Sequence, residues 1–300
     1  MMKYFYFIFT FLVIIGCNRN NQFNRDNISL AGEWGFRIDS LDQGISKEWY
    51  NSLSDEIVML PGSMAENGKG DEVSLATNWT GDIVDRSYFT DKKYEKYRQP
   101  GNIKIPFWLK PVKYYKGVAW YQKEVLIPEK WEGKRISLHL ERCHWESTLF
   151  VNGKKAGTQN SLSTPHEYEI TDLLVKGKNL LSIRIDNRVI IPIGVNSHSI
   201  SDHTQSAWNG ITGNISLYAT SPVYIDAIKV FPDIESSTAR VIVRIKNPGN
   251  REFKGKLSFR ATSVNSRNEL NQLPKTIKFE TVSDGQQIVL KYNMRNPWLW

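Results

Sequence analysis

Residues 146–157 read ESTLFVNGKKAG, and this stretch decides the fold class. The run from Glu146 to Val151 is typical of a β-strand, and a second short run begins at Lys154. Between them stands Asn152-Gly153. An Asn-Gly pair between two strand-like runs favours a tight turn, because both turn positions need a positive φ. The stretch therefore predicts a β-hairpin.

The sequence on both sides of this hairpin is also typical of strands. Residues 136–141 (ISLHLE) and 181–186 (LSIRID) alternate apolar and polar side chains. Residues 118–127 are expected to form another long strand. The one helical signal is a single turn that Thr171 is expected to cap and Gly177 to close. Many short strands with regular turns indicate an all-β protein built as a β-sandwich.

A domain boundary is expected near Ser221-Pro222, which divides the chain into residues 28–220 and 221–300. Five short strands in the second part indicate an immunoglobulin-like sandwich, although the cysteine pair of antibody domains is missing. The expected strands lie at 223–231, 239–247, 255–263, 275–281 and 287–293.

The N-terminus is typical of an export signal. Lys3 precedes an unbroken apolar run, residues 4–15, which is too short to cross a bilayer as a stable helix. The run ends in Gly16-Cys17, which resembles a bacterial lipobox in which Cys17 is lipidated. Residues 18–27 would then form a polar tether. The alternative is an ordinary signal peptide that happens to contain a cysteine.

A lipid-anchored protein of this kind is expected in a bacterial cell envelope, in the periplasm or on the outer-membrane surface. Cys143 would be the only remaining thiol, so no intramolecular disulfide is expected, and two cysteines give no zinc-binding pattern.

The formal charge of +8 does not point to nucleic acid. Residues 221–300 hold 13 Lys and Arg against 7 Asp and Glu, so most of the excess lies in the second part. There the basic residues stand singly along alternating strands, as solvated and edge-protecting side chains do. No aromatic-basic stripe of the kind that single strands need is present, and nucleic acid is not an expected partner.

Several stretches together carry a resemblance to a known family. In this order and spacing they resemble the N-terminal half of family 2 glycoside hydrolases, the group of β-galactosidases, β-glucuronidases and β-mannosidases. The resemblance covers roughly residues 28–220 and implies a jelly-roll, galactose-binding-like sandwich before the immunoglobulin-like one. The matching stretches are residues 30–36 (LAGEWGF), 60–62 (LPG), 117–121 (GVAWY), 138–141 (LHLE), 151–153 (VNG), 164–172 (TPHEYEITD), 177–179 (GKN), 183–187 (IRIDN), 208–211 (WNGI) and 215–217 (ISL).

In that family a (β/α)8 barrel carries both catalytic carboxylates, which retaining chemistry holds about 5 Å apart. Residues 297–300 (PWLW) resemble the end of the second domain, just before the barrel begins. The resemblance therefore implies that this chain holds no catalytic residue and is inactive alone. Four acidic residues of this chain are expected to have structural roles at strand ends or in a helical turn, namely Glu141, Glu146, Asp172 and Asp186.

Residues 196–209 form a long polar loop that contains two histidines, an acid and an aromatic side chain. In the family the corresponding loop reaches the mouth of the barrel and helps to hold sugar hydroxyls or an ion. The resemblance makes Asp202 and Trp208 candidates for binding sugar, with Asn209 behind them. The alternative is a solvated loop in which Trp208 closes the edge of the sandwich.

Two features of this region limit what can be transferred. His198 and His203 have no third ligand nearby in the sequence, so neither a metal nor another cofactor is expected. The family usually has an arginine two residues after the Gly-Ile pair, whereas Gly213 stands at that position here.

An insertion at residues 62–117 is rich in polar residues, proline and glycine. Trp79, Arg98 and Trp108 lie in it, and such side chains stack on sugars or hydrogen-bond to them. They are predicted to form one wall of a glycan site. Two other tryptophans flank a strand and its exit and are expected in the core, namely Trp120 and Trp131.

Three functions fit these features. The first is the non-catalytic front half of an exo-acting β-glycosidase, which positions the glycan and braces a barrel encoded downstream. The second is a stand-alone surface lipoprotein that binds glycan without hydrolysing it. The third is a purely structural pair of sandwiches. In the first two the partners are carbohydrate and, through the lipid anchor, a membrane.

Overall fold

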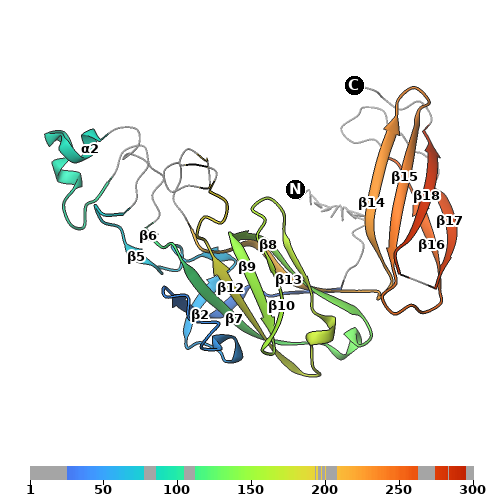
Figure 1. Cartoon of the computed structure of the whole chain (residues 1–300), viewed down its shortest axis with the longest axis horizontal. Helices are drawn as coiled ribbons and strands as arrows, with labels where there is room; N and C mark the ends of the chain where they lie inside the picture. The colour runs from blue at the N-terminus through green and yellow to red at the C-terminus, as the bar shows by residue number, and fades with distance from the viewer. Residues whose placement is uncertain are drawn as a thin grey trace, which may run out of the picture.

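The computed structural model describes residues 26–77, 86–104, 112–192, 208–262, 274–282 and 284–294, together with Gly194, Ser197 and Ile200. The regular structure of these residues is almost entirely β-strand, with only short helical turns, as the sequence predicted. Two sandwiches follow each other along the chain and are joined near residues 221–223 (Figure 1). Within the described ranges, no helix combines the length and apolar character needed to cross a bilayer.

The first sandwich contains two antiparallel sheets. The five-stranded sheet has the order β1-β13-β8-β11, with β4 pairing to the start of β13. Its strands are β1 (Asp26–Ser29), β4 (Gly62–Ser63), β8 (Arg135–His144), β11 (His166–Glu169) and β13 (Gly210–Thr220). The six-stranded sheet has the order β10-β9-β12-β7-β2-β3. Its strands are β2 (Gly32–Asp39), β3 (Glu56–Leu60), β7 (Val118–Leu126), β9 (Glu146–Val151), β10 (Lys154–Gln159) and β12 (Lys178–Asp186).

One hydrophobic core fills the space between these sheets. The period of two in β8 and β12 turns their apolar side chains inward, so Leu138 and Leu140 of one sheet join the same core as Leu181 and Ile183 of the other. Trp131, in the short 3-10 helix Glu129–Trp131, is buried in this core as predicted.

The outer face of the six-stranded sheet is also covered. The segment after β2, which includes the 3-10 helix Trp49–Asn51, lies on it and packs Trp49 and Tyr50 against Trp120 and Phe150. The indole Nε1 of Trp120 donates a hydrogen bond to Asp39 Oδ2 at 3.0 Å. Trp120 therefore belongs to a core, as predicted, but to this second, outer one.

The hairpin is confirmed. Strands β9 and β10 are joined by Asn152 (φ 50°) and Gly153 (φ 79°), which both adopt the left-handed backbone that the turn needs. The helical turn differs in detail from the prediction: it is a 3-10 helix, Thr171–Leu173, without a side-chain cap. Thr171 Oγ1 instead accepts a hydrogen bond from the Ile136 amide at 2.9 Å, because it lies beside β8.

The insertion forms an arm that extends away from the sandwich (Figure 1). Its base is the short pair β5 (Asp71–Glu72) and β6 (Lys113–Tyr114), and its far part contains α2 (Ser87–Thr90) and the 3-10 helix Lys92–Tyr97. A separate hydrophobic cluster around the buried Tyr88 holds the far part of the arm together.

The second sandwich pairs a three-stranded sheet, β14-β15-β18, with the two-stranded sheet β16-β17. The strands are β14 (Tyr224–Asp233), β15 (Thr238–Lys246), β16 (Phe253–Phe259), β17 (Lys275–Thr281) and β18 (Gln286–Asn293). All five overlap the predicted ranges, although β16 ends four residues before the predicted end at residue 263. They enclose a smaller core that includes Val243, Ile245 and Leu290.

Candidate functional site

Two asparagines fix the base of the predicted binding loop to the first sandwich. Asn187, directly after β12, accepts a hydrogen bond from the Gly117 amide at 2.7 Å through its Oδ1. Its Nδ2 donates to the carbonyls of Tyr115 at 2.8 Å and Trp208 at 3.0 Å. One buried side chain therefore ties the chain directly after β12 to the end of the loop at Trp208.

Asn209 anchors the other end. Its side chain is buried, its Oδ1 accepts from the Tyr121 hydroxyl at 2.8 Å, and its Nδ2 donates to the carbonyls of Gly117 and Ile185 at 3.1 and 3.2 Å. The sequence placed Asn209 behind the sugar-binding residues. The structure places it inside the sandwich, where its amide contacts Tyr121, Gly117 and Ile185 rather than facing solvent.

Trp208 is partly exposed at this base. Its ring lies over His144, with ring centroids 4.9 Å apart and planes inclined by 33°. His144 and its neighbour Trp145 are buried, and the Trp145 indole donates to the Asn160 carbonyl at 2.8 Å. A partly exposed indole that packs against a buried ring can present apolar surface to the C–H face of a sugar ring.

A network of charged residues lies beside this base, at the end of β12. Arg184 Nη2 contacts Asp42 Oδ1 at 2.8 Å and Asp186 Oδ2 at 3.1 Å, while Arg188 Nη2 contacts Asp42 Oδ2 at 2.6 Å and Asp186 Oδ2 at 2.5 Å. Glu146 Oε1 lies 3.6 Å from Arg184 Nη1.

Burial alone would raise the pKa of Asp186, but the hydrogen bonds and charge of Arg188 outweigh it and lower that pKa. Asp186 is therefore a paired carboxylate at neutral pH, which fits the structural role predicted for it and for Glu146.

The remaining predicted acids also have structural surroundings. Glu141 is exposed, and its Oε2 accepts from the Asn214 amide at 2.6 Å, across an irregularity in the pairing of β13 with β8. Gly213 sits at that irregularity with φ 76°, and a Cβ there would lie 2.6 Å from the Glu141 carboxylate. The glycine that replaces the family's usual arginine thus meets a backbone requirement of this bulge. Asp172 lies in the first turn of the 3-10 helix Thr171–Leu173.

In the arm, Arg98 is used to hold the fold together. Its Nη1 donates to the carbonyls of Tyr88 and Asp91, the latter at 3.0 Å. The guanidinium group therefore ties the end of α2 to the 3-10 helix that follows. Six residues that the sequence singled out lie outside the described residues: Cys17, Trp79, Trp108, His198, Asp202 and His203. The described part of the chain contains no cluster of three or more metal-ligating side chains.

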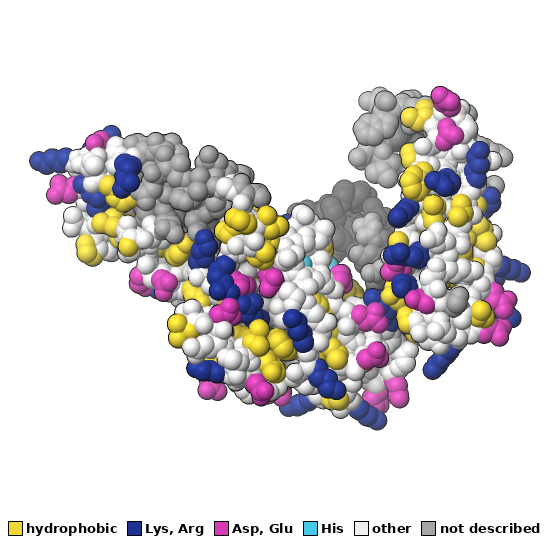
Figure 2. Space-filling model, in the orientation of Figure 1, with side chains coloured by type: hydrophobic (Ala, Val, Ile, Leu, Met, Phe, Trp, Pro, Cys, Tyr) yellow, Lys and Arg dark blue, Asp and Glu magenta, His cyan; other side chains and the backbone are white. Residues whose placement is uncertain are grey.

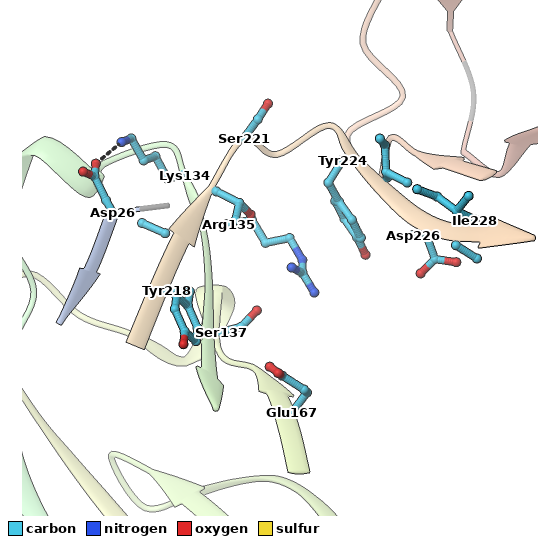
Figure 3. Close-up of a pocket in the computed structure, with 14 residues that line it drawn as sticks. Asp26, Lys134, Arg135, Ser137, Glu167, Tyr218, Ser221, Tyr224, Asp226 and Ile228 are labelled. Atoms are coloured by element: carbon cyan, nitrogen blue, oxygen red, sulfur yellow. Dashed lines mark hydrogen bonds and ion pairs between the residues drawn. The ribbon is translucent and has the colours of Figure 1, made fainter. Parts of the chain in front are cut away.

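A second feature, which no sequence pattern predicted, is a cleft of about 930 Å³ where the two sandwiches meet (Figure 3). Tyr218, Ser137 and Glu167 line it from the first sandwich, and Tyr224 and Asp226 from the second. A cleft of this size at a domain junction is within the range of small-molecule sites.

The charged groups around the cleft are mostly paired. Arg135 reaches across it, with its guanidinium carbon 4.0 Å from the centre of the Tyr224 ring and its Nε 2.9 Å from Glu169 Oε2. Lys134 Nζ lies 2.7 Å from Asp26 Oδ2. Because these charges are already paired, the cleft favours an uncharged, hydroxyl-rich ligand over an ion. The contact between Arg135 and Tyr224 also connects the two sandwiches.

The sequence profile of the glycosyl hydrolases family 2 sugar binding domain matches residues 28–221, which include every strand of the first sandwich except the start of β1. The chain belongs to glycosyl hydrolase family 2. Within family 2 it resembles a β-galactosidase of Thermoanaerobacter pseudethanolicus, with 25% identity over 62% of this chain and 24% of that protein. It also resembles the β-glucuronidase of Sus scrofa, with 24% identity over 77% of this chain and 34% of that protein.

Among solved structures, the β-glucuronidase of Bacteroides uniformis shares the fold with a TM-score of 0.59 and 18% identity, over 92% of this chain and 29% of that one. The chain thus spans about a quarter to a third of the length of these family 2 proteins. The matched portion is their sugar-binding, β-sandwich portion.

Proposed function

We propose that this chain is the non-catalytic N-terminal part of an exo-acting β-glycosidase. In that protein it positions the glycan and supports a catalytic barrel encoded further along the polypeptide. The observation that carries the proposal is the family 2 sugar-binding match over residues 28–221, together with relatives about three to four times longer than the matched segment.

The contact with sugar is assigned to Trp208. Its ring packs against His144, Asn187 holds its backbone carbonyl, and the buried Asn209 follows it in the chain, so its position is set before any sugar arrives. Asp202 belongs to the same loop and remains a proposed hydrogen-bonding partner for sugar hydroxyls. Trp79, Trp108 and Arg98 remain a proposed outer wall, in which Arg98 acts by holding the arm in shape.

The experiment is a kinetic comparison in the full-length native gene product, with p-nitrophenyl β-D-glucuronide and p-nitrophenyl β-D-galactoside as substrates. We expect Trp208→Ala to raise KM by about tenfold, as loss of one good aromatic contact does. Trp49→Ala is the matched control, because Trp49 is also partly exposed but lies on the far face of the six-stranded sheet, under Arg37. Equal KM values for the two folded variants would refute the role of Trp208.

We also propose that the protein is anchored through lipid on Cys17 in a bacterial cell envelope. Cells that express it are grown with labelled palmitate. The wild type and Cys143→Ser should incorporate the label, and Cys17→Ser should not, because Cys143 is buried in the core. Failure of the wild type to incorporate label would refute the anchor.

Stand-alone glycan binding is the second candidate, and the interdomain cleft is the observation that favours it. Its two tyrosines, Tyr218 and Tyr224, and its paired charges suit a neutral saccharide. A native gene product that binds neutral oligosaccharides through Tyr218 but hydrolyses no aryl glycoside would favour this candidate over the first.

A further inference from the structure

The floor of the cleft between the two sandwiches is polar. It is formed by the outer face of the five-stranded sheet, because Ile136 and Leu138, the neighbours of Ser137 along β8, face the core. Tyr218 of β13 pairs with Ser137, and Thr220 lies two residues further along the same outer face. All three hydroxyl-bearing side chains line the cleft.

Two of these hydroxyls, those of Ser137 and Thr220, have no hydrogen-bond partner among the residues that the structure describes. Ser137 is only 7% exposed, and its side chain is directed toward the space between the sandwiches (Figure 3). Buried polar groups are nearly always hydrogen-bonded, because an unpaired group loses its water without a replacement. The two hydroxyls therefore point to a ligand that can pair with them.

The opposite wall of the cleft is apolar. Ile225 and Ile228 of β14 line it and are 47% and 59% exposed. Their partners on β15, Ile245 and Val243, are core residues that are 2% and 1% exposed. The two isoleucines thus lie on the apolar face of their sheet but are left uncovered, and hydrophobic side chains are visible on the surface of this sandwich (Figure 2). Neighbouring exposed apolar side chains beside a cleft are typical of a binding surface.

Each charged side chain that lines the cleft in the described part of the chain already has a partner. The pairs are Asp26 with Lys134, Arg135 with Glu169, Glu167 with His139, and Asp226 with Arg244. An ionic ligand therefore finds no unpaired charge, whereas the hydroxyl groups of an uncharged ligand can add further hydrogen bonds to groups that are already paired.

We infer that this cleft binds an uncharged glycoside that carries an apolar aglycone. The sugar hydroxyls pair with Ser137 and Thr220 on the floor, and the aglycone covers Ile225 and Ile228 on the wall. A free sugar leaves the isoleucines exposed, and a plain hydrocarbon leaves the two hydroxyls unpaired. A molecule with both parts satisfies both sides of the cleft.

This inference rests on the second candidate function, glycan binding at the cleft, and deepens it by naming the class of glycan. It does not depend on glycosidase activity or on Trp208, which packs on His144 at the opposite end of β8 from Arg135. A native gene product that binds a free neutral oligosaccharide at the cleft as tightly as an alkyl glycoside would support that candidate function and contradict the inference.

The first test is calorimetric titration of the native gene product with octyl thio-β-D-glucopyranoside and octyl thio-β-D-galactopyranoside, below the concentrations at which they form micelles. The sulfur in the glycosidic bond resists hydrolysis, so binding is measured alone. At least one of the two should bind at least about tenfold more tightly than its methyl counterpart and than octanol, because only the octyl glycosides carry both parts. Equal affinity for the octyl and methyl compounds, equal affinity for octanol, or no binding of either octyl compound would overturn the inference.

The second test changes the apolar wall. Ile228→Ser should weaken binding of the octyl compound at least about fivefold and leave binding of the methyl compound unchanged. Val289→Ser is the matched control, since Val289 is 58% exposed on the outer face of the same sheet, opposite Ile242. Equal losses of affinity in the two variants would show that the octyl chain binds exposed apolar side chains without selection, and would contradict the inference.

The third test removes a hydroxyl from the floor. Ser137→Ala should weaken binding of the octyl compound about fivefold. It should not lower the unfolding temperature of the free protein, because the Ser137 hydroxyl has no partner among the described residues to lose. Ser258→Ala, which changes an exposed serine of β16, is the control and should leave the affinity unchanged. Wild-type affinity in Ser137→Ala would overturn the inference.

Discussion

The hydroxyl of Tyr121, in the centre of β7, donates a hydrogen bond of 2.8 Å to the Oδ1 of Asn209, at the end of the predicted sugar-binding loop. Tyr121 is buried in the main core, and burial raises its pKa well above the ordinary value, so the hydroxyl keeps its proton and acts as a donor. The end of the loop that is proposed to contact sugar is thus hydrogen-bonded directly to a residue of the main core.

Asn209→Ala should destabilise the first sandwich by about 2–4 kcal/mol, because it removes three hydrogen bonds and leaves the Tyr121 hydroxyl buried without its partner. Urea unfolding followed by fluorescence measures this. The exposed residue Asn27, on β1, provides the control, and Asn27→Ala should change stability by no more than about 0.5 kcal/mol. Similar values for the two variants would show that Asn209 is not an anchor.

The two tryptophans Trp120 and Trp208 should lose stability to very different extents on truncation. Trp120→Ala empties a buried site in the outer core and should lower the free energy of unfolding by about 3–5 kcal/mol. Trp208→Ala removes a partly exposed side chain and should lower it by no more than about 1 kcal/mol. Thermal denaturation distinguishes the two. A large loss of stability in Trp208→Ala would indicate that Trp208 only closes the sandwich edge.

His166 should make the first sandwich less stable in mild acid. The ring is buried, its Nε2–H donates to the Ser161 carbonyl at 2.9 Å, and its Nδ1 lies 2.6 Å from the Ser147 hydroxyl. Burial lowers the pKa of His166 below 6.5, although the Ser161 hydrogen bond opposes this. The folded state therefore binds the proton less readily than the unfolded chain does. Its full stability is present above pH 6.5 and falls as the pH drops toward the lowered pKa.

The measurement is the urea midpoint at pH 7.5 and at pH 5 for the wild type and His166→Gln. We expect the fall in stability between these two pH values to be smaller in the variant. A fall of equal size in both proteins would assign the acid sensitivity to other groups.

Tyr224→Ala should loosen the junction of the two sandwiches without unfolding either one. It removes the contact with the Arg135 guanidinium, which is worth about 0.5–1 kcal/mol at an exposed site. Small-angle scattering of the 300-residue chain should show a wider range of distances between the sandwiches. Phe231→Ala is the control, because Phe231 makes a similar contact with Arg240 within one sheet. Identical scattering from both variants would contradict a connecting role for Tyr224.

Much of the fold followed from local sequence signals. Asn152-Gly153 fixes its hairpin through the φ angles that the turn needs, and the period of two in β8 and β12 fixes which side chains face the core. All five strands of the second sandwich could be located in the same way, because turn residues interrupt the alternating runs.

The functional residues were harder to predict, because their roles depend on distant partners. Arg98 has the side chain of a sugar-binding residue, but its Nη1 donates to two carbonyls of its own segment. The exposure of Val230 could not be predicted either. Its apolar character is that of an ordinary core residue, and only the structure shows that it is 57% exposed.

The most direct test of the account is to assay the native gene product and the 300-residue chain side by side for hydrolysis of p-nitrophenyl β-D-glucuronide and p-nitrophenyl β-D-galactoside. We predict that the native product hydrolyses at least one of the two substrates and that the 300-residue chain hydrolyses neither. Hydrolysis by the 300-residue chain, or no hydrolysis by a folded native product, would contradict the proposal that this chain is the sugar-positioning part of a longer β-glycosidase.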